Sequence, residues 1–464
     1  MPPDSRAAPP TLARLPYFLA GSFLFGLKHN LDRFVASALF GKSWSLFNYL
    51  IPPEHGASLL RLGREEMRFY GALLLVATPF IFGGVILTLR RLRSAGLPPA
   101  LVVLFFVPVV NLVFFLMLCV VPARSSADPR TGQARRAGWL TRVLPETILG
   151  SAAAAVGVTL LLGLLVTFFG VRMLEHYGWG LFVGLPFAMG LFAALLHGYR
   201  TPRRLYECMA VSLLAPILLG ALLLAFAVEG VLCLAMAGPI VSVLSAFGGA
   251  LGYLLQRRPS PGVSPAALLA AALAAPFLMA AERASPPIAP LLEVTTAVEV
   301  DASPEVVWRH VVAFSEIAPP EEWLFRVGIA YPLRATIEGR GPGAVRRCVF
   351  STGAFVEPIT EWDAPHRLAF EVEAQPPPLQ EWTPWRHLQP AHLHDYLRSE
   401  KGEFRLVLLR GGRTRLEGTT WYRHDLWPAA YWRVWSDGII HSIHLRVLRH
   451  IRGRAEEETT GARP

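Results

Sequence analysis

Hydrophobic residues are distributed very differently in the two parts of this chain. Before about residue 285 the sequence is a series of long apolar runs. About seven or eight of these runs approach the ~20 residues that a transmembrane helix needs. Beyond residue 290, apolar and charged residues alternate as in a soluble domain. The pattern predicts a multi-pass α-helical membrane domain and then a soluble domain, with helices at 15–40, 67–89, 99–121, 144–169, 178–197, 206–228, 230–255 and 264–281.

The third apolar segment, 99–121, conflicts with a simple alternating topology. Arginines follow both segment 67–89 and segment 99–121, and both groups favour the cytoplasmic side of a membrane. They cannot share that side if residues 99–121 cross completely. Pro108 permits a kinked or re-entrant helix, so we expect a kink there. The sequence leaves the membrane side of the soluble part open, because that side depends on whether the last segment crosses.

The first apolar segment contains a polar pair. Lys28 and Asp32 are four residues apart, so they can pair on one face of a helix. Ionisable residues inside a membrane helix are often functional, which makes this pair a candidate for a transport pathway. The alternative is an interfacial helix whose charges lie among lipid headgroups.

The soluble part alternates like a β-rich domain with two helices. LEVTTAVEV at 292–300 predicts a strand, and Ser303 with Pro304 predicts the start of a helix. A long helix is expected from about Pro428 to Ala455. Further strands are expected at 326–338, 343–351, 353–362, 366–374, 402–411 and 413–424.

Three stretches of the soluble part resemble the START-like superfamily, also called SRPBCC, in its polyketide cyclase-type members. They are VEVDASPEVVWRHVVAF, GAFVEPITEWDAPHRLAFEV, and the region from TRLEGTTWYRHDLWPAAYW to VLRHIRGRAE. The resemblance covers about residues 291–455. It implies a helix-grip fold, in which a curved antiparallel sheet encloses a long helix with an apolar cavity between them. Members bind lipids, sterols, polyketides or other hydrophobic molecules, and some are enzymes, but no shared catalytic motif transfers a catalytic residue to this chain.

A weaker resemblance covers about residues 15–122. The stretch TPFIFGGVILTLRRLRSAGLPP is similar to a family of small bacterial integral membrane proteins of unknown function. The family pattern falls on Arg90, Arg91, Leu92 and Gly96. This chain has Arg93 and Ser94 where that family usually has His-Asp, and the resemblance implies no activity.

The chain therefore divides into a membrane part and a START-like part. We expect a disordered N-terminus at 1–10, a polytopic membrane domain at 11–283 and a Pro-rich linker at 284–292. The START-like domain is expected at 293–455, and a disordered tail at 456–464.

Aromatic and branched residues point to an apolar cavity. Nine of the twelve tryptophans follow residue 290, although a half-buried sheet also needs such residues for its core. On a helical wheel, one broad face of the final helix is apolar. The expected cavity residues are Phe355, Trp421, Trp432, Trp435, Ile439, Ile443 and Val447.

Two groups of histidines raise the question of a metal site. His441 and His444 are spaced i, i+3 on the final helix, but no acidic residue of that helix is placed to complete a site. His392 and His394, with His387 nearby, form a His-x-His pair that could bind zinc together with Asp395 or His441. The pair lies in a Pro-rich connection, however, where polar residues are common anyway. We therefore predict no metal and no cofactor. His424 and Asp425 are a possible base and its orienter, but their position favours a strand-to-helix turn.

Charge and cysteine content exclude two further classes of protein. Residues 291–464 carry 21 basic and 23 acidic side chains, which leaves 23 basic and 11 acidic ones in the apolar part. That excess suits loops beside anionic lipids, and no nucleic-acid motif is present. The four cysteines form no CxxC pair, so no disulfide framework is predicted. Three lysines in a chain rich in Ala, Pro and Gly suggest a bacterial genome rich in G and C, hence an inner membrane.

The sequence thus favours a membrane-tethered START-like domain that binds, senses or transfers a hydrophobic small molecule or lipid. One alternative is a cyclase, hydrolase or lyase that acts on such a ligand. The other is a transporter whose soluble domain senses the ligand. Expected partners are membrane lipids and the ligand, without nucleic acid; the ligand's identity and the oligomeric state are not specified by the sequence.

Overall fold

The structure, a computed structural model, forms two compact units. Unit 1, the helical unit, comprises residues 1–52, 58–222 and 237–287. Unit 2, the C-terminal unit, comprises residues 53–57, 223–236 and 288–464. The residues described are 12–42, 44, 49, 64–106, 110–121, 144–170, 177–257, 265–284, 288–383, 393 and 396–461.

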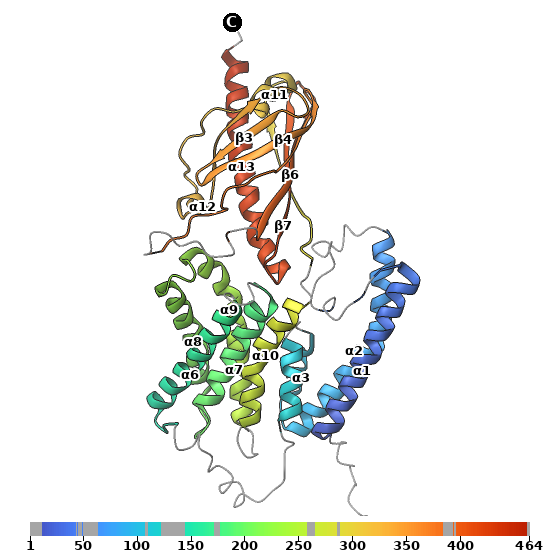
Figure 1. Ribbon diagram of the computed structural model, residues 1–464, viewed down its shortest axis with the longest axis vertical. Helices are drawn as coiled ribbons and strands as arrows, with labels where there is room; N and C mark the ends of the chain where they lie inside the picture. Colours follow the sequence, from blue (N-terminus) through green and yellow to red (C-terminus); the bar gives the residue numbers. More distant parts are fainter. Residues whose placement is uncertain are drawn as a thin grey trace, which may run out of the picture. The chain divides into compact units, whose positions relative to one another are not determined.

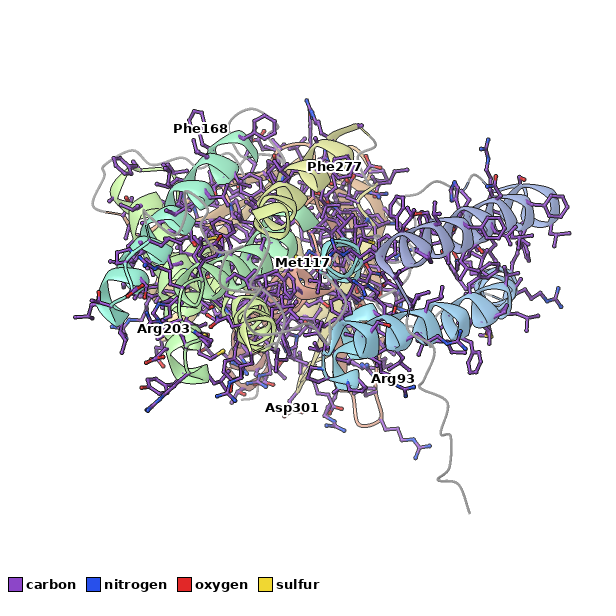
Figure 2. The ribbon with its side chains drawn as sticks, turned by 90° about the horizontal axis from the view of Figure 1, so that it is seen from below. Arg93, Met117, Phe168, Arg203, Phe277 and Asp301 are labelled. Carbon is purple, nitrogen blue, oxygen red and sulfur yellow. The ribbon has the colours of Figure 1, made fainter. Side chains whose placement is uncertain are left out.

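The helical unit is built from apolar helices (Figure 1). Within the described residues, five helical stretches are long and apolar enough to cross a membrane: 65–95, 148–168, 180–197, 205–225 and 231–256. Large apolar side chains such as Phe168 and Phe277 project from the outer surface of the helices (Figure 2). The elements are α1 (Arg14–Phe40), α2 (Arg64–Ala95), η3 (Pro99–Phe106), α3 (Val110–Val120), α6 (Ile148–Phe168), η5 (Gly180–Gly184), α7 (Leu185–His197), α8 (Leu205–Ala225), α9 (Val231–Gln256) and α10 (Pro265–Ala284).

Helix α7 is the buried centre of the helical unit, and small residues let its neighbour approach. A Cβ atom added at Gly190 would lie 2.0 Å from the carbonyl oxygen of Ser245 on α9. One added at Gly248 would lie 2.1 Å from the carbonyl oxygen of Phe187. Ser245 also donates a hydrogen bond of 3.0 Å to the carbonyl of Pro186. Close backbone contact through small residues is typical of helix packing in membranes.

The predicted multi-pass helical class is confirmed, and each of the expected apolar segments is largely helical. Segment 99–121 is not one regular helix, because its first part, η3, is a 3-10 helix and its second part is α3. The kink expected at Pro108 lies outside the described residues. α1, α3 and α10 are not among the five stretches, since α1 contains several charges and α3 has only 11 residues.

The C-terminal unit contains a seven-stranded antiparallel sheet in the order β1-β7-β6-β5-β4-β3-β2, counted over the described residues. The long helix α13 packs against β1, β7 and β2, and against α11 (Figure 1). The strands are β1 (Leu292–Val300), β2 (Pro332–Glu338), β3 (Val345–Phe350), β4 (Gly353–Asp363), β5 (Arg367–Glu371), β6 (Leu397–Leu408) and β7 (Thr414–His424). The helices are α11 (Pro304–Val312), α12 (Trp323–Arg326) and α13 (Ala429–Gly461).

Alternating apolar positions place one face of the sheet against α13. Leu416 on β7 and Leu368 on β5 are fully buried and join one core with Leu448 and Ile451 of α13. Apolar residues that recur every second position in strands, and every three to four positions in helices, are the patterns that predicted these elements from the sequence. Ser303 occupies the expected N-cap of α11, but its side chain makes no capping hydrogen bond.

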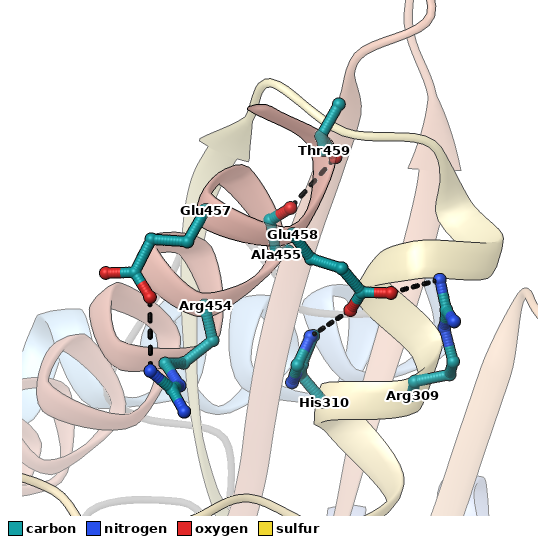
Figure 3. Close-up of polar contacts among 7 residues, drawn as sticks. All are labelled: Arg309, His310, Arg454, Ala455, Glu457, Glu458 and Thr459. Carbon is teal, nitrogen blue, oxygen red and sulfur yellow. Dashed lines mark hydrogen bonds and ion pairs between the residues drawn. The ribbon is translucent and has the colours of Figure 1, made fainter. Parts of the chain in front are cut away.

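Polar contacts fix the end of α13 to α11. Glu458 accepts from Arg309 at 2.7 Å and from His310 at 2.9 Å, so one carboxylate joins the two helices (Figure 3). Both partners of the arginine pair are substantially exposed, which keeps the energetic contribution of this pair small. The position of α13 therefore depends mainly on its apolar face.

Candidate functional site

A cavity lies between the concave face of the sheet and α13. Its volume is about 120 Å³, close to a cavity of ~150 Å³ known to hold benzene and below the usual 300–1,000 Å³ of ligand pockets. The space thus matches one aromatic ring or a short acyl chain. The lining residues are Arg346, Cys348, Phe350, Phe355, Glu357, Phe370, Val372, Ser399, Lys401, Gly402, Glu403, Phe404, Gly418, Thr419, Thr420, Ile440, Ile443, His444, Val447 and Leu448.

A buried ion pair lies in the cavity wall, beside polar lining residues such as Lys401 and Thr420. Arg346 on β3 and Glu357 on β4 are direct partners in the antiparallel register, and the guanidinium donates to the carboxylate. Arg346 is 1% exposed and Glu357 is 6% exposed. Nε of Arg346 makes no geometric hydrogen bond among the described residues, although the guanidinium interacts with the Cys348 thiol. A buried donor without a partner costs about 1–3 kcal/mol, so this atom is available to an acceptor on a ligand.

The environment of the pair changes how its members titrate. Burial raises the pKa of Glu357 above its ordinary value, and the charge of Arg346 only partly offsets this. Burial also raises the pKa of the neighbouring Cys348 thiol to about 12. A negative charge in the cavity is therefore unfavourable unless a positive charge lies beside it, and Arg346 supplies that positive charge for Glu357.

Aromatic rings enclose the ion pair and limit the cavity. The guanidinium of Arg346 lies 5.5 Å from the ring centre of Phe314, and at 5.5 and 5.4 Å from the rings of Phe370 and Phe404. Such cation–π contacts stabilise a charge that is removed from water. Gly402 makes room for this arrangement, since a Cβ atom there would lie 2.6 Å from the Phe370 ring.

His444 completes the polar lining from the side of α13. Its Nε2 lies 2.8 Å from the hydroxyl of Thr420, and its Nδ1 lies 3.2 Å from the hydroxyl of Thr296. Burial lowers the pKa of His444 to about 4, so the ring is neutral at pH 7. His441, its neighbour on the helix, is exposed and has Nδ1 2.8 Å from the same Thr296 hydroxyl. Both histidines thus contact threonines of the sheet.

In the described part of the chain, no three His, Cys, Asp or Glu side chains are grouped so that they could hold a metal ion. His387, His392, His394 and Asp395 lie outside the described residues.

The structure brings some of the expected cavity residues together and places others elsewhere. Phe355, Ile443 and Val447 line the cavity. Trp421 is half-buried, with the ammonium of Lys401 4.5 Å from its ring centre. The other expected residues of α13 do not belong to the described lining: Trp432, Trp435 and Ile439.

Arg346, Cys348 and Glu357 were not among the predicted site residues, although the sequence contains a signal for them. In a strand, alternate residues share a face, so Arg346 and Cys348 lie on one face of β3. Glu357 has the same phase on β4 as the buried Ile359. A charged residue in the buried phase of each of two paired strands is uncommon unless the two charges interact.

His424, at the end of β7, is a second buried histidine. It is 2% exposed, and neither ring nitrogen makes a hydrogen bond within the described part of the chain, although the backbone of Leu426 lies near. Burial lowers its pKa to about 4. Asp425 forms an ion pair with Arg398 at 3.7 Å. His424 is therefore a neutral core residue.

In the helical unit, Lys28 and Asp32 form the ion pair that their spacing predicted. Asp32 is 0% exposed and also accepts a hydrogen bond of 2.6 Å from the hydroxyl of Tyr49. Its second oxygen, Oδ1, has no partner among the described residues. The ammonium of Lys28 lies 4.5 Å from the centre of the Tyr49 ring. The carboxylate is thus removed from the surface of the helical unit.

The curved antiparallel sheet, the long C-terminal helix and the cavity between them define the C-terminal unit as a START-like, helix-grip domain. Residues 292–387 match the family described as polyketide cyclase / dehydrase and lipid transport. The fold and this match confirm the START-like resemblance of the C-terminal region. No curated protein matches the chain in sequence.

Several solved structures are similar to the C-terminal region at low sequence identity. The Zhui aromatase/cyclase from Streptomyces sp. R1128 is 16% identical, over 36% of this chain and 96% of that one, with a TM-score of 0.25. A norcoclaurine synthase point mutant from Thalictrum flavum, in complex with a transition-state analogue, is 11% identical over 37% and 99%, with a TM-score of 0.25. A protein from Nitrosospira multiformis is 15% identical over 36% and 99%, with a TM-score of 0.24.

Proposed function

We propose that this chain is a bacterial inner-membrane protein whose START-like domain binds a hydrophobic small molecule or a lipid chain in the cavity beneath α13. The observation that carries the proposal is an apolar cavity with one buried, partly unsatisfied cation, Arg346. Most buried polar groups have a hydrogen-bond partner, so an unpaired donor at the wall of a cavity is a candidate ligand contact. The apolar helices of the helical unit support membrane tethering, because five of those described have the length and composition of membrane spans.

The geometry of the cavity limits the kinds of ligand that can bind. Rings of Phe350 and Phe355, 4.8 Å apart, offer an apolar surface, and Nε of Arg346 offers a donor. A ring or short chain that carries a hydroxyl or carbonyl oxygen satisfies both features. A ligand larger than about one ring needs side chains at the wall to move, because cores are closely packed.

Photolabelling of the full chain in detergent tests this proposal. The probe is 3-trifluoromethyl-3-phenyldiazirine, a single-ring compound that forms a covalent adduct with its surroundings when illuminated. We expect peptides of β3, β4 and the middle of α13 to be labelled, and phenol in excess to reduce that labelling. Labelling of outward residues such as Phe168 and Phe277 provides an internal control that phenol leaves unchanged.

A cavity-filling variant provides the matched comparison. Gly418 lines the cavity, and a Cβ atom there meets only ordinary contacts, with Leu448 Cδ2 at 3.6 Å. Gly418→Val should therefore fill the space and abolish cavity labelling. Gly438→Ala, at a position with nothing within 4 Å of the added atom, should label like the natural chain. Equal cavity labelling of both variants would contradict the proposal.

Transport is a second function that one observation favours. Asp32 is fully buried beside Lys28 in α1, which departs from an interfacial helix whose charges face headgroups. If α1 carries a transport pathway, Asp32→Asn should abolish flux of a hydrophobic probe across proteoliposomes while cavity photolabelling persists. Unchanged flux in Asp32→Asn would remove this alternative.

A further inference from the structure

Residues 223–236, from the end of α8 to the first turns of α9, belong to the C-terminal unit, and their contacts there are specific. Both oxygens of the Glu381 carboxylate accept from backbone N–H groups at the start of α9. The distances are 2.9 Å from Leu232 and 3.0 Å from Cys233. The N–H of Val231 donates to the carbonyl of Trp382 at 3.0 Å. The first N–H groups of a helix have no partner within the helix, so Glu381 and Trp382 satisfy three of them.

The contact is shaped for a carboxylate in this position. Glu381 is 8% exposed, and a Cβ atom at Gly230 would lie 2.2 Å from its Oε2. Only glycine at position 230 therefore allows this approach. A second contact lies on α13, where the hydroxyl of Tyr431 donates to the carbonyl of Met236. A negative charge at a helix N-terminus is also stabilised by the helix dipole.

The same contact adjoins the cavity wall. Leu232, Cys233 and Met236 pack against a core cluster of the C-terminal unit that Ile439 and Ile443 also pack against. Ile443 in addition lines the cavity. The buried members of the cluster are Phe325, Ile329, Leu379 and Leu393. An outward displacement of Ile443 thus requires this cluster, and the start of α9 within it, to rearrange.

We propose that the start of α9, held by Glu381, keeps the cavity at its small volume, and that its release admits larger ligands. This proposal rests on the proposed ligand-binding function. α9 is one continuous helix from Val231 to Gln256, and Pro239 interrupts its hydrogen-bond pattern just beyond Met236. The start of α9 is therefore a point where occupancy of the cavity is linked to the first turns of a long apolar helix.

Hydrogen–deuterium exchange on the full chain in detergent tests whether Glu381 holds α9. Glu381→Gln retains the shape but leaves only one acceptor oxygen, so the amides of residues 231–233 should exchange about five- to tenfold faster. Gly230→Ala places a methyl group against the Glu381 carboxylate and should speed the exchange of the same amides. The control Glu371→Gln alters an exposed carboxylate on β5 and should change nothing there. Unchanged exchange in both Glu381→Gln and Gly230→Ala would overturn the role of Glu381.

Competition against photolabelling tests the link to the cavity. In Glu381→Gln, 1-aminoanthracene, which has three fused rings, should displace the single-ring diazirine at about fivefold lower concentration than in the natural chain. Displacement by phenol, which fits the small cavity, should be unchanged. If 1-aminoanthracene competes equally in both proteins while phenol still competes, the link is wrong and ligand binding stands. If the diazirine never labels the cavity, the proposed function and this link both fail, while the exchange result still decides the role of Glu381.

Discussion

Arg346 and Glu357 face each other across β3 and β4 and form a buried ion pair in the wall of the cavity. Each charge is removed from water, so each depends on the other. The effects of Arg346 and Glu357 on the free energy of unfolding are therefore not additive, and the two residues must be tested together.

Removal of one partner of this pair should destabilise the C-terminal unit strongly. We expect Glu357→Gln or Arg346→Met to lower the free energy of unfolding by about 3–5 kcal/mol, because a buried charge loses its compensation. The double variant Arg346→Met/Glu357→Leu should regain most of that loss. Urea unfolding followed by tryptophan fluorescence measures this, since nine of the twelve tryptophans follow residue 290. A double variant no more stable than the singles would show that the pair does not act as a unit.

Two histidines with lowered pKa values, His424 and the half-buried His444, predict the direction of their contribution to the pH dependence. Burial lowers the pKa of His444 and of His424 from 6.5 to about 4. Between these values the unfolded chain binds more protons than the folded one, so stability increases with pH there. The stability is fully present above pH 6.5 and is lost as the pH falls towards 4. For His424 the shift corresponds to about 3 kcal/mol at most. The raised pKa of Glu357 acts in the opposite direction, so the measurement is the difference in urea midpoint between the natural chain and His444→Gln across this range. A natural chain that loses no more stability on acidification than His444→Gln would contradict the sign.

His424→Phe should stabilise the protein. The ring nitrogens of His424 are buried without hydrogen bonds, so a phenyl ring of similar shape removes an unsatisfied polar group. We expect a gain of about 1 kcal/mol at pH 7.5 and a shallower loss of stability on acidification. His366→Phe, at a side chain that is 65% exposed, should produce neither effect. Thermal unfolding at two pH values distinguishes the two variants, and a clear loss of stability in His424→Phe would mean that its nitrogens are satisfied.

The attachment of α13 should depend on apolar packing far more than on its surface ion pairs. Leu448 is fully buried, and Leu448→Ala should cost about 2–5 kcal/mol. Glu458→Gln breaks the contacts with Arg309 and His310 at the surface and should cost less than about 1 kcal/mol. The measurement is urea unfolding of both variants. Similar losses in the two would show that the surface contacts hold the helix.

Much of the fold follows from the period of the apolar residues. The strand expected at 353–362 is β4 at Gly353–Asp363, and the helix expected at 428–455 is α13 at Ala429–Gly461. Both elements have long, regular patterns of apolar residues, and such patterns predict the type and extent of an element well. The short helix α12 and the 3-10 stretch η3 escaped prediction, because their conformations depend on tertiary contacts and not on a repeated pattern.

The candidate site was less predictable than the fold. Of the residues expected at a cavity, Phe355 and Ile443 line it, whereas the expected tryptophans are not among its described lining residues. The ion pair of Arg346 and Glu357 depends on the exact register of β3 and β4, and a shift by one residue would turn both side chains to the other face. The contact of Glu381 with α9 joins residues about 150 positions apart, and no local pattern predicts such a pairing.

The anchoring of the first turn of α9 also fixes the rotational phase of that helix. Each residue in an α-helix turns the chain by about 100°, so one residue inserted after Cys233 would rotate all later side chains by that angle relative to the anchored turn. Gly248, which closely approaches the carbonyl of Phe187, would then point in a different direction relative to the anchored turn. Insertions or deletions just after Cys233 keep the later side chains of α9 in the same direction relative to the anchored turn only when they add or remove roughly whole helical turns. Changes of length before Gly230 lie outside the helix and do not rotate these side chains relative to that turn. The gene should therefore tolerate changes of length on one side of Glu381's contact and not on the other.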